Sequence, residues 1–321
     1  MVMFDLTLQG RAHIRENLPC QDKTVTMEWN GTRCIALADG AGSAKLSHFG
    51  AQAAVDAVAA LLCQNFIEFY MSSSPEKVKR NIIKSVHEAL DAVTKKHGCQ
   101  LRDLASTLLF AAVKDDMYIT GQLGDGAIVF CRNGELKLSR KPERGEFANQ
   151  TWFTTTLNSE NHFHLFKGVL SGITGFFIMS DGAAESLYQR KTEKLAKIIK
   201  YIMIASYFKE KSYFMQTMTS FFQEHIISRT IDDCAVASIS LYNSYAELFN
   251  SIDNNETYRL FYKKRSKKEY TNDYINILLN SSNANNIEDL SKITQICTKT
   301  LKLRIRRLRD LGFALVTNKF Y

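Results

Sequence analysis

The chain has 321 residues and carries 41 Lys and Arg against 33 Asp and Glu, a formal net charge of +8. Its hydrophobic content of 45% and charged content of 23% are typical of a folded globular protein and exclude a disordered chain. Seven cysteines without a CxxC pair argue against a zinc site or a disulfide framework and favour a reducing compartment. The first residues form no signal-peptide pattern, and no apolar run approaches ~18 residues. We therefore expect a cytoplasmic protein with no membrane partner.

Hydrophobic patterning predicts the elements of the first 240 residues. Strands over 25–29 and 33–39 flank Asn30-Gly31, which is a strong hairpin signal. Helical spacing follows over 49–70 and 76–97. The further predicted elements are strands over 106–113, 117–125, 127–133 and 168–181, helices over 183–228, and a last strand over 234–242. Segregated strands and helices favour an α+β layered domain over a doubly wound parallel sheet.

The excess positive charge lies at one end of the chain. Residues 251–321 hold 14 Lys and Arg against 7 Asp and Glu, whereas residues 1–250 are close to neutral. This asymmetry indicates two parts with different roles. We expect a catalytic domain over residues 1–243, a basic connector over 244–270, and a small domain over 271–321.

Aspartates next to small residues follow apolar strands at several points. The stretches are CQD (Asp22), LADGAG (Asp39), QLGDG (Asp125) and IMSDG (Asp181), and the pair Asp232-Asp233 precedes the last strand. A single Asp-Gly pair usually marks a tight turn, but a turn does not explain five such sites in one domain. Carboxylates brought together repel one another unless a cation lies between them, and Mg²⁺ or Mn²⁺ prefers oxygen ligands. The sequence therefore predicts a divalent metal site, where Gly40 lets its carbonyl turn toward an ion.

The same motifs also carry a family resemblance. DGAGS with the helix after it, ASTL, GDG, SDG and the final DD occur in the same order as in the metal-dependent protein phosphatases of the phosphatase 2C type. The stretches AHIRENLPCQD (12–22) and GEFANQTWFTT (145–155) resemble a bacterial branch of that family. The resemblance covers roughly residues 5–241. It implies a four-layer αββα sandwich of two antiparallel sheets flanked by helices, and hydrolysis of phosphoserine and phosphothreonine in proteins.

The resemblance further implies that these residues bind two Mn²⁺ or Mg²⁺ ions and a third, weaker one. The expected ligands are Asp39 bridging both ions, the Gly40 carbonyl, Asp181, Asp232, Asp22 through water, and Asp125 on the third ion. Asp39, Asp181, Asp232 and Asp22 are the residues expected to be required for catalysis. Asp232, and not Asp233, aligns with the ligand position. Two ions ~3.5–4 Å apart can share a water, lower its pKa and aim it at phosphorus.

Two positions depart from the family pattern. Ala41 replaces a histidine that many members use to protonate the leaving alcohol, so His13, His48 or a water must act instead, or turnover is slow. Asn17 stands where the family has a phosphate-binding arginine. We expect Arg15, together with His13, to bind the phosphate instead, because an arginine fork suits phosphate well.

The end of the chain resembles a winged helix-turn-helix. Asn286 can cap a short helix, and a second helix places Leu301, Ile305 and Leu308 on one face. A second face of that helix carries Lys299, Lys302, Arg306 and Arg309, and FALV (313–316) is predicted as a strand. In DNA-binding members the second helix enters the major groove. The partner of this basic module is open between DNA and a protein, with a protein or intramolecular partner favoured.

Two hypotheses for the function follow. The main one is a metal-dependent protein serine/threonine phosphatase that opposes a cognate kinase, with a C-terminal basic module for targeting or regulation. The alternative is a catalytically weak phosphatase-like protein that recognises phosphoproteins or DNA. Ala41 and Asn17 favour the alternative, whereas the intact set of aspartates favours the enzyme.

Overall fold

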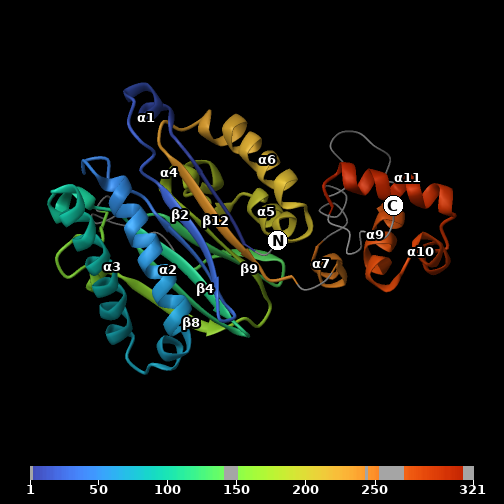
Figure 1. The fold of residues 1–321 in the computed structure, drawn as a ribbon, viewed down its shortest axis with the longest axis horizontal. Helices are drawn as coiled ribbons and strands as arrows, with labels where there is room; N and C mark the ends of the chain where they lie inside the picture. Colours follow the sequence, from blue (N-terminus) through green and yellow to red (C-terminus); the bar gives the residue numbers. More distant parts are fainter. Residues whose placement is uncertain (1–2, 141–150, 243–244, 253–270, 314–321) are drawn as a thin grey trace. The chain divides into compact units, whose positions relative to one another are not determined.

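The computed structural model describes residues 3–140, 151–242, 245–252 and 271–313. Two five-stranded antiparallel sheets lie face to face between layers of helices (Figure 1). One sheet has the order β2 (Lys23–Trp29), β3 (Thr32–Ala38), β4 (Leu108–Lys114), β5 (Met117–Leu123) and β8 (His164–Val169). The other has the order β1 (Met3–Leu8), β12 (Cys234–Ser240), β9 (Ile173–Met179), β6 (Ala127–Arg132) and β7 (Glu135–Leu138). The predicted sandwich of two antiparallel sheets is confirmed.

The helices begin and end close to the apolar patterns in the sequence. They are α1 (Arg11–Glu16), α2 (Ser47–Met71), α3 (Pro75–His97), α4 (Asp181–Leu187), α5 (Ile198–Phe208), α6 (Lys211–Phe222), α7 (Tyr245–Ser251), α9 (Thr271–Asn280), α10 (Ile287–Thr294) and α11 (Thr298–Asp310). At the start of α3, Ser74 accepts a hydrogen bond from the Lys77 amide and Pro75 takes the first helical position; at its end Gly98 adopts a left-handed conformation. These are the start and stop signals expected of a stable surface helix.

Alternating side chains on the strands build two cores. On β3, Ile35 and Leu37 face the other sheet, whereas Cys34 and Ala36 face α2. On β4, Leu109 and Ala111 likewise pack against Phe176 and Ile178 of β9. Because side chains alternate across a strand, one buried strand supplies both the space between the sheets and the layer under the helices.

Helix α2 is long and apolar enough, by length and composition, to cross a membrane. Its side chains instead fill the layer between the first sheet and α3, where Ala54, Val58 and Leu62 are fully buried. An apolar helix covered on two sides is a core helix of the sandwich.

The β2–β3 hairpin turns at Asn30-Gly31 as predicted, and both residues have positive φ, 48° and 74°. That pair of left-handed residues defines the tight turn whose twist matches antiparallel strands. The uniform helical prediction for residues 183–228 is wrong in part, because the ribbon of β10 (Tyr188–Gln189) and β11 (Lys194–Leu195) separates α4 from α5.

The chain divides into two compact units. One, the sandwich unit, contains the described residues of Val2–Met203 and Met218–Leu241, and the other, the C-terminal unit, contains those of Ile204–Thr217 and Tyr242–Tyr321. The boundaries at 243 and 270 expected from the sequence stay predictions. Most of the expected connector, including its Lys263–Lys268 run, lies outside the described residues, as do residues 314–316 of the expected last strand.

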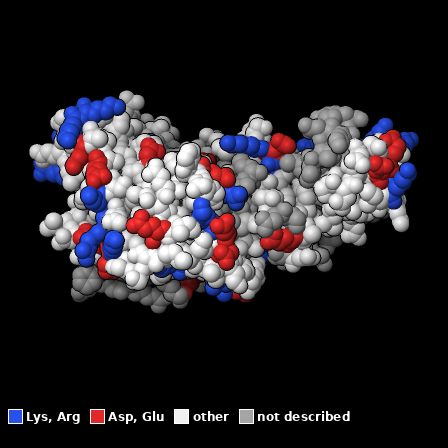
Figure 2. Space-filling view, turned by 60° about the horizontal axis from the view of Figure 1, so that its bottom comes forward, with Lys and Arg blue, Asp and Glu red and all other residues white. Residues whose placement is uncertain are grey.

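On the face shown in Figure 2, Lys and Arg side chains are interspersed with Asp and Glu side chains over the described surface. A mixed surface of this kind is ordinary for a globular protein.

Candidate active site

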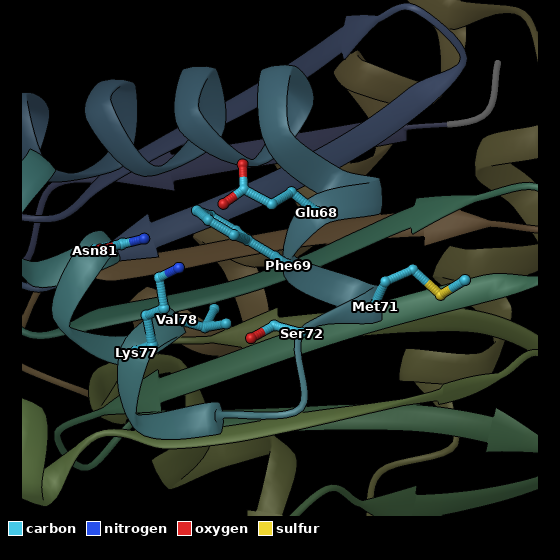
Figure 3. Close-up of a pocket in the computed structure, with 7 residues that line it drawn as sticks. All are labelled: Glu68, Phe69, Met71, Ser72, Lys77, Val78 and Asn81. Atoms are coloured by element: carbon cyan, nitrogen blue, oxygen red, sulfur yellow. The ribbon is translucent and has the colours of Figure 1, made fainter.

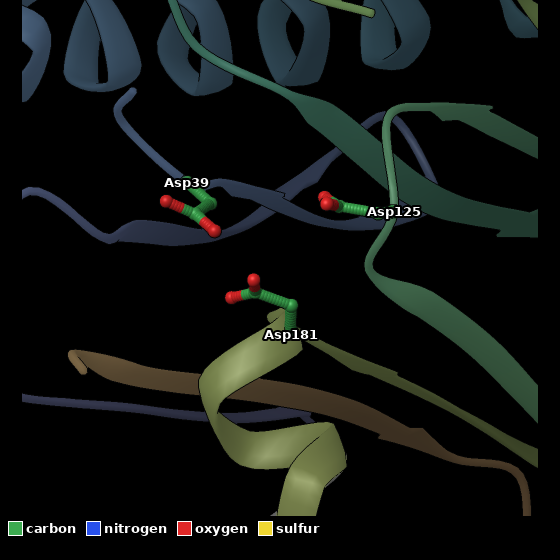
Figure 4. A group of neighbouring side chains, drawn as sticks. All are labelled: Asp39, Asp125 and Asp181. Carbon is green, nitrogen blue, oxygen red and sulfur yellow. The ribbon is translucent and has the colours of Figure 1, made fainter. Parts of the chain in front are cut away.

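Three aspartates from distant parts of the sequence meet at one edge of the sandwich. Asp39 follows β3, Asp125 lies in the turn between β5 and β6, and Asp181 begins α4 directly after β9. Each offers a carboxylate oxygen within 4.8 Å of the others, and Figure 4 shows all three side chains pointing toward one another. The predicted convergence of these aspartates is therefore present in the structure.

Backbone pairing to the loop before β4 holds Asp39 in place. The Asp39 amide donates to Thr107 Oγ1 at 2.9 Å, and the Thr107 amide donates back to the Asp39 carbonyl at 2.8 Å. The next residue, Gly40, forms a β-bridge with Ser106. The loop that carries the carboxylate is thus fixed by extended pairing at the point where β3 ends.

Gly40 is required for a reason that the sequence did not reveal. A Cβ at this position would lie 2.8 Å from Ser47 Cβ and 2.9 Å from the Gln21 carbonyl oxygen. Two segments therefore pack against its α-carbon, one before β2 and one at the start of α2. The glycine lets three segments of the site approach closely.

Burial is the main factor that disfavours the charged forms of these aspartates, and repulsion between them adds to it. Asp22, which precedes β2, is 1% exposed, and burial raises the pKa of its carboxyl well above the usual range, with Asp233 and Asp181 raising it further. Burial also raises the pKa of Asp39, and Asp22 and Asp181 add to that effect. Asp181 has a raised pKa as well, first because of burial. These carboxyls form one electrostatic cluster.

Asp232 joins this cluster from the residues before β12. Its side chain is more exposed than those of Asp22 and Asp39, but partial burial and then the charge of Asp181 still raise its pKa. Its Oδ1 accepts a hydrogen bond of 2.8 Å from the Asp233 amide. Asp232 therefore lies at the rim of the cluster with its other carboxylate oxygen left for a further ligand.

The neighbouring Asp233 has a different role. It is 2% exposed, its Oδ1 accepts from the Gly10 amide at 2.6 Å, and its Oδ2 accepts from the Gln21 amide at 2.6 Å. His13 Nδ1 lies 2.9 Å from the same Oδ2. Because its oxygens already serve these groups, Asp233 ties α1 and the Asp22 segment to β12.

The expected phosphate-binding residues lie in different surroundings. His13, on α1, has a side chain 15% exposed, and its Nδ1 contacts buried Asp233. Arg15, also on α1, has a side chain 77% exposed and pairs with Glu16 at 3.0 Å. Asn17 ends α1 in a left-handed conformation. Of the two candidates, His13 is the one that lies against the acidic cluster.

His48, the other candidate acid, lies in the first turn of α2. Burial, and then Lys23 and His97, lower its pKa. The imidazole is therefore less often protonated at neutral pH than an ordinary histidine, which makes it a poor proton donor.

The acidic cluster fits a divalent metal ion. All of its side-chain donors are carboxylate oxygens, which are the ligands that hard divalent cations prefer. Among the described residues, Asp22 Oδ2 is buried and has no hydrogen-bond partner. A buried carboxylate oxygen without a partner is costly unless a cation compensates it.

A match to a protein-family model shows the family to which this chain belongs. The model described as "Protein phosphatase 2C" matches residues 9–222. The chain belongs to the protein phosphatase 2C family. The matched range contains Asp22, Asp39, Asp125 and Asp181, and it ends before Asp232.

Further similarities agree with this membership. The chain is 28% identical over 162 residues to "Serine/threonine-protein phosphatase 3" of Escherichia coli K12. That match covers 49% of this chain and 64% of the relative, so the chain spans less than two thirds of the relative's length.

Solved structures of bacterial serine and serine/threonine phosphatases share the fold. The serine/threonine phosphatase Stp1 of Staphylococcus aureus superposes with a TM-score of 0.51 at 13% identity, covering 76% of this chain and 96% of its own. The serine/threonine phosphatase of S. agalactiae gives 0.51 at 15% identity, covering 75% and 100%. A bacterial serine phosphatase gives 0.53 at 15% identity, covering 75% and 97%. About a quarter of this chain therefore has no counterpart in those structures.

A separate pocket of about 260 Å³ lies where α2 ends and α3 begins (Figure 3). Its lining includes Phe69, Met71 and Val78 together with Glu68 and Lys77. None of the cluster aspartates lines it, so the candidate active site of this phosphatase 2C family member is the acidic cluster and not this pocket.

Proposed function

We propose that the protein is a metal-dependent phosphatase of phosphoserine and phosphothreonine in proteins. The observation that carries the proposal is the meeting of Asp39, Asp125 and Asp181 from three separate elements within 4.8 Å. Membership of the phosphatase 2C family and the similarity to an E. coli protein named as a serine/threonine-protein phosphatase support it.

The roles that we propose for the acidic residues follow their positions. Asp39 would hold two ions, with the Gly40 carbonyl, Asp181 and Asp232 as further ligands. Buried Asp22 would act through water, and exposed Asp125 would bind a third, weaker ion. Bound Mn²⁺ or Mg²⁺ would polarise the phosphoryl oxygens and acidify a water.

The remaining residues bind and orient the substrate in this proposal. His13, oriented by buried Asp233, contacts the phosphate from α1, and Arg15 approaches it from the exposed side of the same helix. The substrates are cytoplasmic phosphoproteins made by an opposing serine/threonine kinase. The C-terminal unit serves targeting or regulation.

The alternative is a phosphatase-like protein that binds phosphoproteins with weak turnover. The observation that favours it is Ala41, which is buried and hydrogen-bonds through its amide to the Ala105 carbonyl, so that no side-chain proton donor stands at that position. Measured turnover separates the two functions.

The proposal is tested by measuring phosphate release from a phosphothreonine peptide by wild type and by Asp39→Asn, side by side. Wild type should release phosphate in Mn²⁺ or Mg²⁺ and lose activity in EDTA. Asp39→Asn should lower kcat/KM by at least ~100-fold, about 2.7 kcal/mol of transition-state stabilisation, because it removes the bridging charge.

Asp115→Asn is the matched control for this experiment. Asp115 is an exposed residue of the β4–β5 turn with φ of 52°, a conformation that asparagine also tolerates. It makes the same chemical change at the far end of β4 and should leave kcat/KM unchanged. Metal-independent turnover, or full activity of Asp39→Asn, would contradict the metal site, and binding of the peptide without turnover would favour the alternative.

A further inference from the structure

The helices at the end of the C-terminal unit form a compact bundle with a fixed turn. α9, α10 and α11 contact one another, and three residues, Gln295 to Cys297, join α10 to α11 (Figure 1). Gln295 has a φ of 58°, and Ser291 Oγ donates to the Ile296 carbonyl at 2.7 Å. A helix pair joined by a three-residue turn is the arrangement of a helix-turn-helix.

The two faces of α11 differ completely in chemistry. Leu301, Ile305 and Leu308 are buried in the bundle, as the sequence predicts. The exposed cations of α11 are Lys299, Lys302, Arg306 and Arg307. Spacings of three and four residues place them along one side of the helix, over ~12 Å at 1.5 Å per residue.

Some cations of α11 make contacts within the C-terminal unit, and others are exposed to solvent. Arg304 pairs with Asp273 of α9 at 3.3 Å and lies over the Tyr274 ring. Arg309 is partly buried. The exposed four have Asp310, at the end of α11, as their nearest acidic neighbour in that helix. Like charges at this spacing destabilise a helix, so the face favours an anionic partner.

The end of α11 is held firmly within the same unit. Lys209 is 4% exposed, its Nζ donates to the Leu311 carbonyl and lies 3.5 Å from the centre of the Phe313 ring. The Glu210 amide donates to the Gly312 carbonyl at 2.7 Å. These contacts fix the helix, so its exposed face is presented by a rigid support.

We propose that the exposed face of α11 binds duplex DNA, with α11 in the major groove. A single helix with its side chains, ~10–12 Å across, matches a groove ~12 Å wide, and four cations along its length reach phosphates on both sides. Exposed Leu303, at 62%, lies among these cations and can contact a thymine methyl group. This binding function goes beyond the proposed phosphatase activity and does not depend on it.

The structure also indicates how far the proposed DNA contact extends. Glu288 is exposed on the first turn of α10 and Asp289 follows it, so that helix end repels phosphate. Among the described residues, the contact that we propose therefore uses the four exposed cations of α11 and not the start of α10. We expect about four phosphates to be neutralised and modest, salt-sensitive affinity.

Fluorescence anisotropy with the full chain and a labelled 24-base-pair duplex tests the proposal over a range of salt. Four phosphate contacts predict a slope of log affinity against log salt of about −3.6, which is a loss of about 150-fold between 50 and 200 mM. The double variant Lys302→Gln/Arg306→Gln should reduce the magnitude of that slope by about 2. Circular dichroism checks that both proteins keep their helices.

The matched control is Lys95→Gln/Lys96→Gln, which removes the same charge from exposed positions at the end of α3. It should leave the slope and affinity unchanged. Hydrolysis of the phosphothreonine peptide by the α11 variant, measured in parallel, separates loss of DNA binding from loss of the proposed phosphatase activity.

Three results would overturn the proposal. The first is no binding of duplex at 20 mM salt. The second is an equal loss in the α3 control, which would make net charge the cause. The third is equal affinity for polyglutamate of the same total charge, since an acidic protein would then fit the face as well as DNA does.

Discussion

At the scale of single residues, two adjacent aspartates of the site differ in the hydrogen bonds that they accept. Among the described residues, Asp232 accepts a backbone amide hydrogen bond through Oδ1, whereas both Asp233 oxygens accept such bonds. Asp233 Oδ2 also lies 2.9 Å from His13 Nδ1, so a proton on that nitrogen would let the buried carboxylate orient the imidazole. A histidine oriented in this way loses little entropy when it binds a substrate.

His13 should therefore matter more to substrate binding than Arg15. We predict that His13→Gln lowers kcat/KM for a phosphothreonine peptide by about 10–100-fold, because a hydrogen bond to a charged group contributes about 1.5–3 kcal/mol. Arg15→Gln should cost less than about 3-fold, since its exposed side chain pairs with Glu16. Steady-state kinetics with thermal unfolding of each variant measures this, and a larger loss for Arg15→Gln would reverse the assignment.

The sequence predicts the position of Asp39, Asp125 and Asp181 because each follows a recognisable apolar strand. The role of Asp233 cannot be read in this way. It depends on Gly10 and Gln21 reaching the start of β12 from more than 200 residues away. Gly40 shows the same limit, since its neighbours Ser47 and Gln21 become visible only in three dimensions.

At the scale of elements, local signals predict some parts of the fold and long-range pairing decides others. The β2–β3 hairpin follows from Asn30-Gly31, whose conformations are set locally. β1 was not predicted, and among the described strands it pairs with β12 alone, which comes from the other end of the sandwich unit's sequence. β10 and β11 are two residues each, too short for an alternating pattern inside an otherwise helical stretch.

Helix α11 provides a prediction at this scale, because its end depends on one buried lysine. Lys209→Met keeps most of the side-chain volume but removes the hydrogen bond to Leu311 and the charge over the Phe313 ring. Loss of both should destabilise this region by about 1–3 kcal/mol. Amide hydrogen exchange over residues 298–310 should become at least several-fold faster, whereas exchange in β3 and β4 should not change.

Lys211→Met is the control for that experiment. Lys211 begins α6, two residues after Lys209, and its side chain is exposed. The same substitution there should leave exchange of α11 unchanged. Equal protection of α11 in Lys209→Met and wild type would mean that other contacts hold the helix.

At the scale of the whole molecule, the carboxyls that would bind metal lower the stability of the metal-free fold when they are charged. The pKa values of Asp22 and Asp39 are raised in the folded protein, first by burial. Between the ordinary carboxyl value, ~4, and those raised values, the folded chain binds more protons than the unfolded chain. Without metal, the contribution of these groups to the stability of the fold must therefore fall as pH rises through that window.

Thermal unfolding in EDTA makes this effect measurable. At pH 7.5 we expect Asp39→Asn to unfold at a higher temperature than wild type, because it removes one of several clustered charges; each kcal/mol gained corresponds to about 2–4 °C. The difference should shrink as pH falls through the raised pKa values of Asp22 and Asp39, because the wild-type carboxyls then take up protons. Saturating Mn²⁺ at pH 7.5 should reverse the order, since binding stabilises only the protein that keeps its ligands. If Asp39→Asn were instead less stable than wild type in EDTA at pH 7.5, the aspartates would be stabilising the fold by themselves, and there would be no electrostatic reason for a cation at their centre.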